Sequence, residues 1–342
     1  MSQHRDVIAI GASAGGVEAL RALVAGLPSD FPGTVLVVLH IPRDAPSVLP
    51  AILTRTGPLV AETAVHGAEL GHGRIHVAPH DHHLLVLGNR IRLTRGPTEN
   101  GHRPAIDPLF RSVARAFGPR AVGVVLSGTR DDGAAGLAGL VARGGTAVVQ
   151  DPAEALFAAM PAAALAYVPT RHVAPAAGLG GLIARITAMD LPRTEAGPPD
   201  GDADTALGEP GPPSAEDLTT PAAGYGCRSC GGALVPFGGG PAPRYRCPAG
   251  HAWAPEGLLD EPDEALESAL WMALRALEDK AALSRRLATA QRSPESATGS
   301  RFRDLAVEAA RAGDTIRGLI AQLGPASTPA GEATNTPVTG HP

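Results

Sequence analysis

A glycine-rich turn near the amino terminus limits most strongly how this chain folds. The segment Gly11-Ala12-Ser13-Ala14-Gly15-Gly16 follows an apolar run at residues 7–10 and precedes a helical pattern of apolar residues that begins at Val17. A strand, a tight turn and a helix in that order are typical of an α/β fold. The helix start directs free N–H groups and a positive dipole end toward Ser13. Ser13 is therefore a candidate nucleophile, and the candidate oxyanion and turn residues are Ala14, Gly15 and Gly16.

Other interpretations of this turn have to be weighed. A dinucleotide site needs glycine where Ser13 stands, and it needs an acidic residue at the end of the second strand, where the chain has His40. A P-loop is excluded because no Gly-Lys-Ser/Thr follows the glycines. A glycine turn with an incidental serine fits the same residues. The turn alone therefore leaves open whether Ser13 is a nucleophile.

Strand and helix patterns alternate from residue 7 to about residue 189. We expect strands at 7–10, 34–39, 121–126 and 146–149, and helices at 17–25, 108–117, 134–142 and 178–189. Such alternation predicts a doubly wound α/β fold with a mostly parallel sheet. Gly88-Asn89 separates two short apolar runs and predicts a β-hairpin insert at 84–94.

Composition narrows the class of protein. Hydrophobic residues make up 44% of the chain and charged residues 18%, as in a globular protein. The net charge of −5 and an aromatic content of 3% argue against a nucleic-acid partner. No apolar run has the length of a signal peptide or a membrane span, so we expect no membrane insertion. The three cysteines lie in one short region, which favours a reducing cytoplasm over a disulfide framework.

The chain changes character after residue 190. We expect a catalytic domain at 1–190, a disordered acidic linker rich in proline and glycine at 191–223, a zinc-ribbon-like segment at 224–258, a helical hairpin at 259–323 and a disordered tail at 324–342. Pro262 begins a long amphipathic helix, and Ser293-Pro294 separates it from a second one. We expect these helices to bind a regulatory partner or a second copy of the chain.

Cys227, Cys230, Cys247 and His251 form a candidate structural zinc site. A Cys-x2-Cys pair, sixteen intervening residues and a Cys-x3-His pair supply four ligands of the type that zinc prefers. Four protein ligands leave no open position, so we expect no catalysis at this metal and no cofactor for catalysis. We also expect the catalytic domain to fold independently of it. Another histidine group, His80, His82 and His83, lacks a completing ligand pattern, and we assign it to a solvated loop.

A serine nucleophile needs a base and a group that orients the base. In an open parallel sheet, such residues gather where the carboxyl ends of the strands meet. Ser13, His40 and the pair Asp131/Asp132 each follow a predicted strand. Their order along the chain differs from that of α/β-hydrolases, but a triad is defined by geometry.

Several motifs in fixed order resemble the catalytic domain of CheB-type protein-glutamate methylesterases, and the resemblance covers about residues 6–189. The motifs are Gly11–Gly16, Leu39-His40-Ile41-Pro42, Arg103–Phe110, Ser127–Gly136, Gln150-Asp151-Pro152 and Met160-Pro161. The resemblance implies an ester hydrolase that cleaves glutamate γ-methyl esters on chemoreceptor-like proteins and releases methanol, with glutamine deamidation in many members. It implies Ser13 as nucleophile, His40 as base and Asp132 as the orienting acid. We expect the neighbouring Asp131 to face solvent.

Three departures from that family stand out. The family's Gly-Met-Gly-x-Asp-Gly motif here has Thr129-Arg130 in place of Met-Gly, which puts the substrate preference in question. We expect no receiver domain, because the first strand begins almost at residue 1, and the C-terminal module is additional. A non-catalytic signalling scaffold that docks a receptor or a methyltransferase is the alternative function.

Overall fold

The computed structural model describes residues 4–41, 47–191, 224–237, 244–260, 262–290 and 297–323. One parallel sheet forms its centre, with the strand order β3-β4-β2-β1-β7-β8-β9. The strands are β1 (Val7–Ala12), β2 (Thr34–Leu39), β3 (Val60–Thr63), β4 (Arg74–Val77), β7 (Ala121–Val125), β8 (Thr146–Gln150) and β9 (Val173–Ala174). This confirms the predicted α/β class and all four predicted strands, and it adds β3, β4 and β9.

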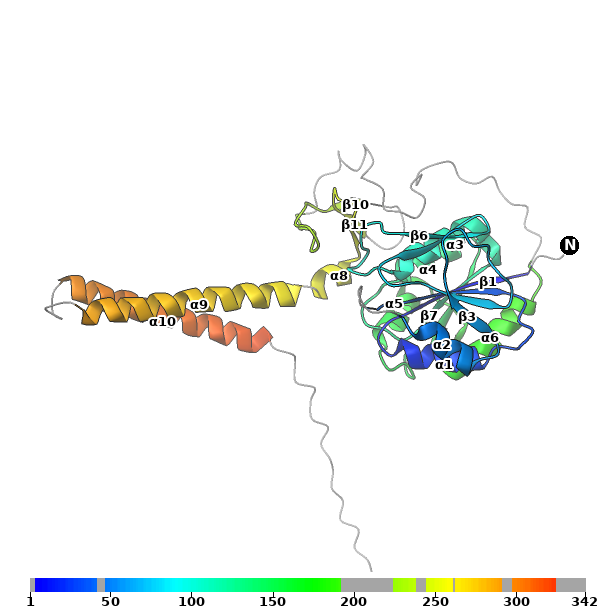
Figure 1. Ribbon diagram of the computed structural model, residues 1–342, viewed down its shortest axis with the longest axis horizontal. Helices are drawn as coiled ribbons and strands as arrows, with labels where there is room; N and C mark the ends of the chain where they lie inside the picture. The colour runs from blue at the N-terminus through cyan, green and yellow to red at the C-terminus, as the bar shows by residue number, and fades with distance from the viewer. Residues whose placement is uncertain are drawn as a thin grey trace, which may run out of the picture. The chain divides into compact units, whose positions relative to one another are not determined.

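Helices cover both faces of the sheet (Figure 1). Figure 1 places α1, α2 and α6 on one side of β1, and α3, α4 and the β5–β6 hairpin on the other. The helices are α1 (Gly16–Ala25), α2 (Leu49–Thr56), α3 (Ile106–Phe117), α4 (Ala134–Ala142), α5 (Ala159–Tyr167) and α6 (Ala176–Ala188). The hairpin insert is confirmed as β5 (His83–Leu87) and β6 (Arg90–Thr94), joined at Gly88-Asn89.

The two faces of the sheet explain why its central strands are apolar at every position. In β1, Ile8 and Ile10 belong to the core cluster that packs under α1 and α6, whereas Val7 and Ala9 belong to the cluster under α3 and α4. Successive side chains of a strand point to opposite faces, so a sheet that is buried twice needs apolar residues throughout. The uninterrupted apolar runs at 7–10 and 34–39 are the sequence signal of this arrangement.

The Cys/His segment is a small antiparallel sheet followed by a short helix. It contains β10 (Val235–Phe237), β11 (Arg244–Arg246), β12 (Ala252–Trp253) and α8 (Pro255–Asp260). It belongs to the same compact unit as the parallel sheet, residues 1–260. Its residues meet residues 98–107 in buried contacts, so the segment packs against the α/β unit. The predicted linker and tail lie almost entirely outside the described residues.

Two long helices form a second unit. These are α9 (Pro262–Thr289) and α10 (Ala297–Leu323), which pack against each other through buried Leu274, Ala281, Ala306 and Ala309. The predicted helical hairpin is thus present. Several large apolar side chains of the unit remain exposed, among them Trp271, Met272 and Leu283. None of the described helices combines the length and the apolar character needed to cross a membrane.

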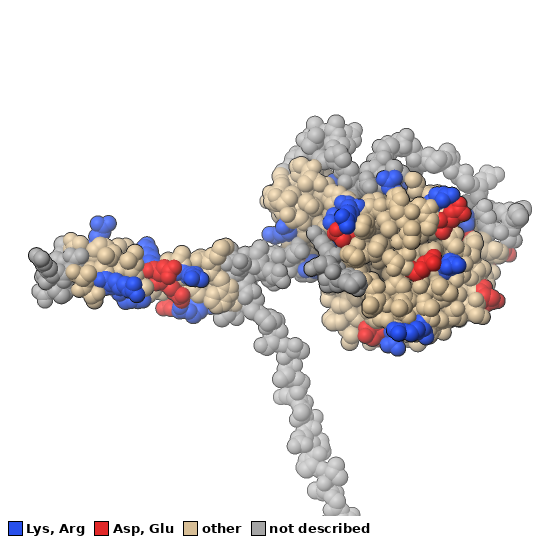
Figure 2. Space-filling view, in the orientation of Figure 1, with Lys and Arg blue, Asp and Glu red and all other residues tan. Residues whose placement is uncertain are grey.

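Opposite charges are neighbours on the surface of the α/β unit. Figure 2 shows blue and red side chains next to one another on the visible face of this unit. Pairs of this kind include Arg74 with Glu62 and Arg90 with Glu69. Exposed pairs contribute little to stability, about 0–1 kcal/mol each, so burial of the two apolar faces has to stabilise the fold.

Two glycines in α6 test the packing of α1 on α6. A Cβ at Gly180 would lie 2.4 Å from the Leu23 carbonyl oxygen and 2.8 Å from the Gly26 Cα, whereas a Cβ at Gly181 would meet only the end of Arg185, at 3.6 Å. Gly180→Ala should therefore lower the free energy of unfolding by about 1–3 kcal/mol. Gly181→Ala should leave it unchanged or raise it by up to about 1 kcal/mol, because alanine is the better helix former. Equal effects in urea unfolding would contradict this close approach.

Candidate functional site

Ser13 lies in the turn between β1 and α1, and glycines hold that turn against a second loop. Its N–H donates to the Ser127 carbonyl at 3.0 Å. A Cβ at Gly128 would lie 2.9 Å from the Ser13 Cβ, and Gly15 has a φ of +69° with Ser127 Oγ 2.7 Å from where its Cβ would be. Larger residues at either glycine would push the two loops apart. The turn thus presents Ser13 at the carboxyl end of the sheet, half-buried.

His40 and Asp132 reach the same point from the two strands that flank β1. His40 follows β2, and its Nδ1 lies 3.1 Å from Ser13 Oγ. Its Nε2 lies 2.8 Å from Asp132 Oδ2, and both side chains are almost fully buried. The structure therefore brings together the three residues that the sequence suggested. The nitrogens are used in the opposite sense to the serine-protease triad, in which Nε2 faces the serine.

The surroundings of Asp132 keep its carboxylate charged. Burial acts to raise its pKa, but the hydrogen bond and charge of His40, with the Ile106 N–H at 2.7 Å, hold the pKa of Asp132 well below its usual range. A charged carboxylate only accepts hydrogen bonds, so the proton of His40 lies on Nε2. Nδ1 is then free to accept the hydroxyl proton of Ser13.

The backbone near Ser13 offers donors for a developing negative charge. Of the three predicted oxyanion residues, Gly16 uses its N–H within the turn, where it donates to the Ser13 carbonyl at 2.9 Å. Among the backbone hydrogen bonds of the described residues, none uses the N–H of Ala14 or Gly15. These two groups at the start of α1 are the remaining candidates for an oxyanion hole.

The prediction that Asp131 faces solvent is wrong. Its exposed fraction is 5%, because α8 of the Cys/His segment covers it and places Glu256 against its carboxyl group. Burial, followed by the hydrogen bond and charge of Glu256, raises the pKa of Asp131 to about 8. Asp131 therefore keeps a proton at neutral pH while its neighbour Asp132 is charged.

A second layer of buried charge lies behind Asp132. Asp107 is 1% exposed, and its Oδ1 accepts the N–H groups of Gly133 and Gly136 at 3.1 and 2.6 Å. Asp107 therefore caps α4, although it lies in the first turn of α3. Glu99 is fully buried between Arg111 and Arg244. Burial alone would raise its pKa, but the two guanidinium groups lower the pKa of Glu99 to about 2.

Two positions near the site escaped the sequence reasoning. His102 stacks on His40 with ring centroids 3.8 Å apart, and Asn100 Nδ2 donates to Asp132 Oδ1 at 3.2 Å. Nothing in the pattern separates these residues from their neighbours, because a turn between Glu99 and His102 brings them to the site. His83 is also corrected. It lies buried in β5 rather than in a solvated loop, and its ring bonds the Pro97 carbonyl and the Ala105 N–H.

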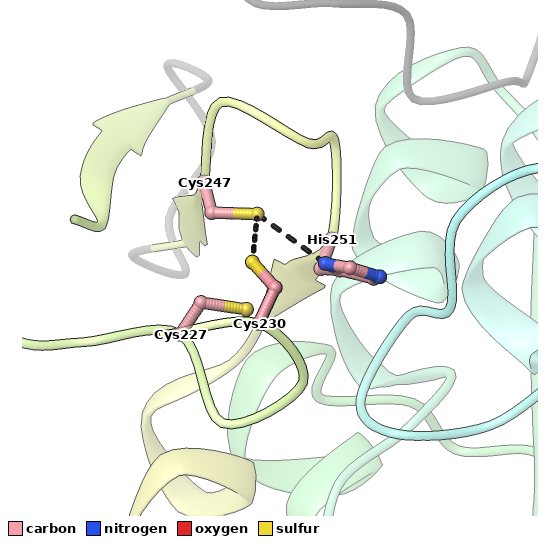
Figure 3. Close-up of side chains that lie close together, drawn as sticks. All are labelled: Cys227, Cys230, Cys247 and His251. Carbon is pink, nitrogen blue, oxygen red and sulfur yellow. Dashed lines mark hydrogen bonds between the residues drawn. The ribbon is translucent and has the colours of Figure 1, made fainter. Parts of the chain in front are cut away.

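The four predicted metal ligands converge in the Cys/His segment. Figure 3 shows the side chains of Cys227, Cys230, Cys247 and His251 directed toward one common centre. Their ligand atoms all lie within 4.8 Å of one another, with 3.6 Å between the sulfurs of Cys230 and Cys247. A tetrahedron with zinc–sulfur bonds of about 2.3 Å has edges of about 3.8 Å, so the cluster is compatible with a metal site.

The fold and the site together define a class of α/β protein. Its members have an open parallel sheet with a serine–histidine–aspartate arrangement at the carboxyl edge. The family model of the CheB methylesterase matches residues 8–183, just over half of the chain. The chain belongs to this family. The crystal structure of the CheB methylesterase catalytic domain of Thermotoga maritima superposes with a TM-score of 0.51 at 26% identity, over 54% of this chain and 99% of the other.

Curated relatives agree with this assignment over the same region. A protein-glutamate methylesterase/protein-glutamine glutaminase of Anaeromyxobacter dehalogenans is 44% identical over 162 residues, 47% of each chain. A relative with the same activities in its name, from Xanthomonas euvesicatoria, is 38% identical over 173 residues, 49% of this chain and 48% of the other. The chain thus matches about half the length of these relatives, and the Cys/His segment lies outside the matched residues of the family model.

The pKa of Asp131 predicts a pH-dependent stability. Between the ordinary aspartate pKa of about 4 and the folded value of about 8, the unfolded chain releases a proton that the folded chain keeps. The free energy of unfolding should therefore fall across this window in the wild type, and the fall should be smaller in Asp131→Asn. Urea unfolding of both proteins at several pH values checks this. A difference between them that does not change with pH would contradict the raised pKa.

Proposed function

We propose that this chain is a methylesterase that hydrolyses glutamate γ-methyl esters on a chemoreceptor-like protein and releases methanol. The observation that carries the proposal is the hydrogen-bonded series Ser13, His40 and Asp132 at the carboxyl edge of a CheB-family sheet. The names of the relatives support the substrate class, and they also support deamidation of receptor glutamine as a second reaction. The complete series counts against a purely non-catalytic scaffold.

The geometry supports a two-step acyl transfer. Ser13 Oγ attacks the ester carbonyl carbon while His40 Nδ1 takes the hydroxyl proton, and Asp132 stabilises the imidazolium that forms. The N–H groups of Ala14 and Gly15 donate to the oxyanion of the tetrahedral intermediate. The imidazolium then gives its proton to the leaving oxygen, so that methanol departs and an acyl-serine remains. A water molecule, deprotonated by the same histidine, releases the glutamate and restores Ser13.

Loss of either Ser13 or His40 should remove nearly all hydrolysis. The residues of a triad act as a unit, so Ser13→Ala and His40→Ala should each lower kcat by a factor on the order of 10⁶, with little further loss in the double variant. Methanol release from a methylated chemoreceptor measures the effect. Ser47→Ala, which changes a serine next to α2, is the matched control and should keep full activity. Continued methanol release by Ser13→Ala would refute the mechanism.

The Cys/His segment is proposed to hold one structural zinc ion. Trp253 Nε1 donates to Cys227 Sγ at 3.3 Å and so helps to orient this ligand, and few apolar side chains form the small core around it. Structural zinc supplies an apparent ~10–16 kcal/mol, enough to order such a unit. The three cysteines lie near one another and are free thiols. This fits a reducing cytoplasm, which is the proposed compartment.

Metal analysis of the purified chain should find stoichiometric zinc. Cys230→Ser removes a ligand and should abolish zinc binding. Ser229→Ala changes the adjacent residue, which is not a ligand, and should retain the metal. Chelation should increase hydrogen exchange at residues 227–237 and 244–251. A metal-free preparation in which this segment is still protected would rule out the site.

The helical hairpin is the proposed site of association with a regulatory partner or a second copy of the chain. Trp271, Met272 and Leu283 are exposed on α9. Large apolar side chains that are exposed together often mark a protein–protein interaction site. Sedimentation of the purified chain over a range of concentrations distinguishes self-association from the need for another protein.

A further inference from the structure

The Cys/His segment supplies buried partners to the residues that surround Asp132. Arg244 in β11 is 8% exposed, and its Nη2 lies 2.6 Å from Glu99 Oε2 and 3.3 Å from Asp107 Oδ2. Both carboxylates are 1% exposed, so each needs a compensating cation or hydrogen bonds. Within the described part of the chain, Arg244 is the ion-pair partner of Asp107.

Asp107 transmits this contact to the catalytic turn. Its Oδ2 faces Arg244, while its Oδ1 accepts the N–H groups of Gly133, which directly follows Asp132, and of Gly136 in the first turn of α4. Its own N–H donates to Asp132 Oδ1 at 3.3 Å. A shift of Asp107 would therefore move the turn that carries Asp132 and weaken one of the hydrogen bonds of its carboxylate.

Asn100 forms a second connection to the same carboxylate. Its Nδ2 donates to Asp132 Oδ1, and its Oδ1 accepts the Ala254 N–H at 2.8 Å. Its backbone N–H donates to the Ala252 carbonyl at 2.9 Å. Residues 252–254 thus fix both the backbone and the amide orientation of Asn100. Without them, the amide is free to turn away from Asp132.

The candidate metal ligands lie next to both connections. Arg244 precedes Cys247 by three residues, and Ala252 directly follows His251. The strands β11 and β12 pair with each other, and both ligands lie in the connection between them. A metal that ties Cys247 and His251 to the first two cysteines would therefore hold Arg244 and residues 252–254 in register against the α/β unit.

We propose that Arg244 and the backbone of residues 252–254 are positioning elements of the esterase, through which metal binding in the Cys/His segment sets the orientation of Asp132 and His40. The inference rests on the proposed function, and it assigns the segment an intramolecular role in that reaction. The metal takes no part in the chemistry. It acts by ordering the strands that complete the hydrogen bonds behind the catalytic acid.

The test compares Arg244→Met and Asn100→Gly with wild type in the full zinc-loaded chain. Methionine keeps the apolar stem of Arg244 without its charge, and glycine accepts the positive φ of Asn100, +50°, while removing the amide. Each variant should lower kcat for p-nitrophenyl acetate about 10- to 100-fold, with KM nearly unchanged, because such outer partners orient rather than bind. Arg244→Lys should restore part of the rate.

Two further measurements separate positioning from mere stability. The NMR signal of the His40 Nε2 proton, which reports the bond to Asp132, should shift or broaden in both variants at temperatures where circular dichroism shows a folded chain. Arg246→Met removes an arginine from the same strand that stacks on Phe237, and it should leave rate and signal unchanged. Chelation of zinc should reproduce the loss in wild type and add little to Arg244→Met.

The outcomes distinguish this inference from the proposed function. Wild-type rates and an unshifted His40 signal in both Arg244→Met and Asn100→Gly would overturn the inference, as would full activity of the chelated wild type. If wild type reacts with a fluorophosphonate at Ser13 but releases no methanol from a methylated receptor, the substrate proposal fails while the positioning result stands. If wild type does not react at Ser13, the proposed function fails, and the His40 signal still decides whether the segment orients the imidazole.

Discussion

The buried carboxylate of Asp132 is the group on which the site depends. It accepts hydrogen bonds from His40, from Asn100 and from the backbone of Ile106 and Asp107, so donors from three separate segments meet at its two oxygens. Burial would favour the neutral acid, and these donors reverse that preference. The charge of one side chain thereby fixes which nitrogen of the imidazole carries the proton. The reactive geometry of Ser13 follows from that assignment.

Much of the fold follows from local sequence signals. The apolar runs that become β1 and β2 are buried on both faces, and the turn residues Gly88-Asn89 mark the hairpin locally in the sequence. In contrast, β3 and β4 are four residues each and contain Glu62 and His76, so their alternation is too short to identify. Strands of that length are stabilised by their neighbours in the sheet rather than by propensity.

The site shows the same division between local and long-range information. Ser13, His40 and Asp132 each follow a recognisable strand, so topology alone brings them to one edge. The environment of Asp131 depends on Glu256, and that of Glu99 depends on Arg244, contacts between residues more than a hundred positions apart. Charge pairs at such separations leave no periodic trace in the sequence. The Cys/His segment could therefore be recognised as a ligand cluster, but its place against the α/β unit could not.

The cap of α4 has a consequence for how this fold can be divided. Asp107 belongs to α3, yet it bonds the first free N–H groups of α4, and α4 has no side-chain cap of its own. The two helices therefore have to be exchanged together in any recombination, although a strand and its loops separate them in the chain. A recombination crossover between them would pair α4 with an α3 from another parent. In such a hybrid, α4 would be capped only if that parent also carried an acidic residue at position 107. Crossovers before α3 or after α4 avoid the restriction.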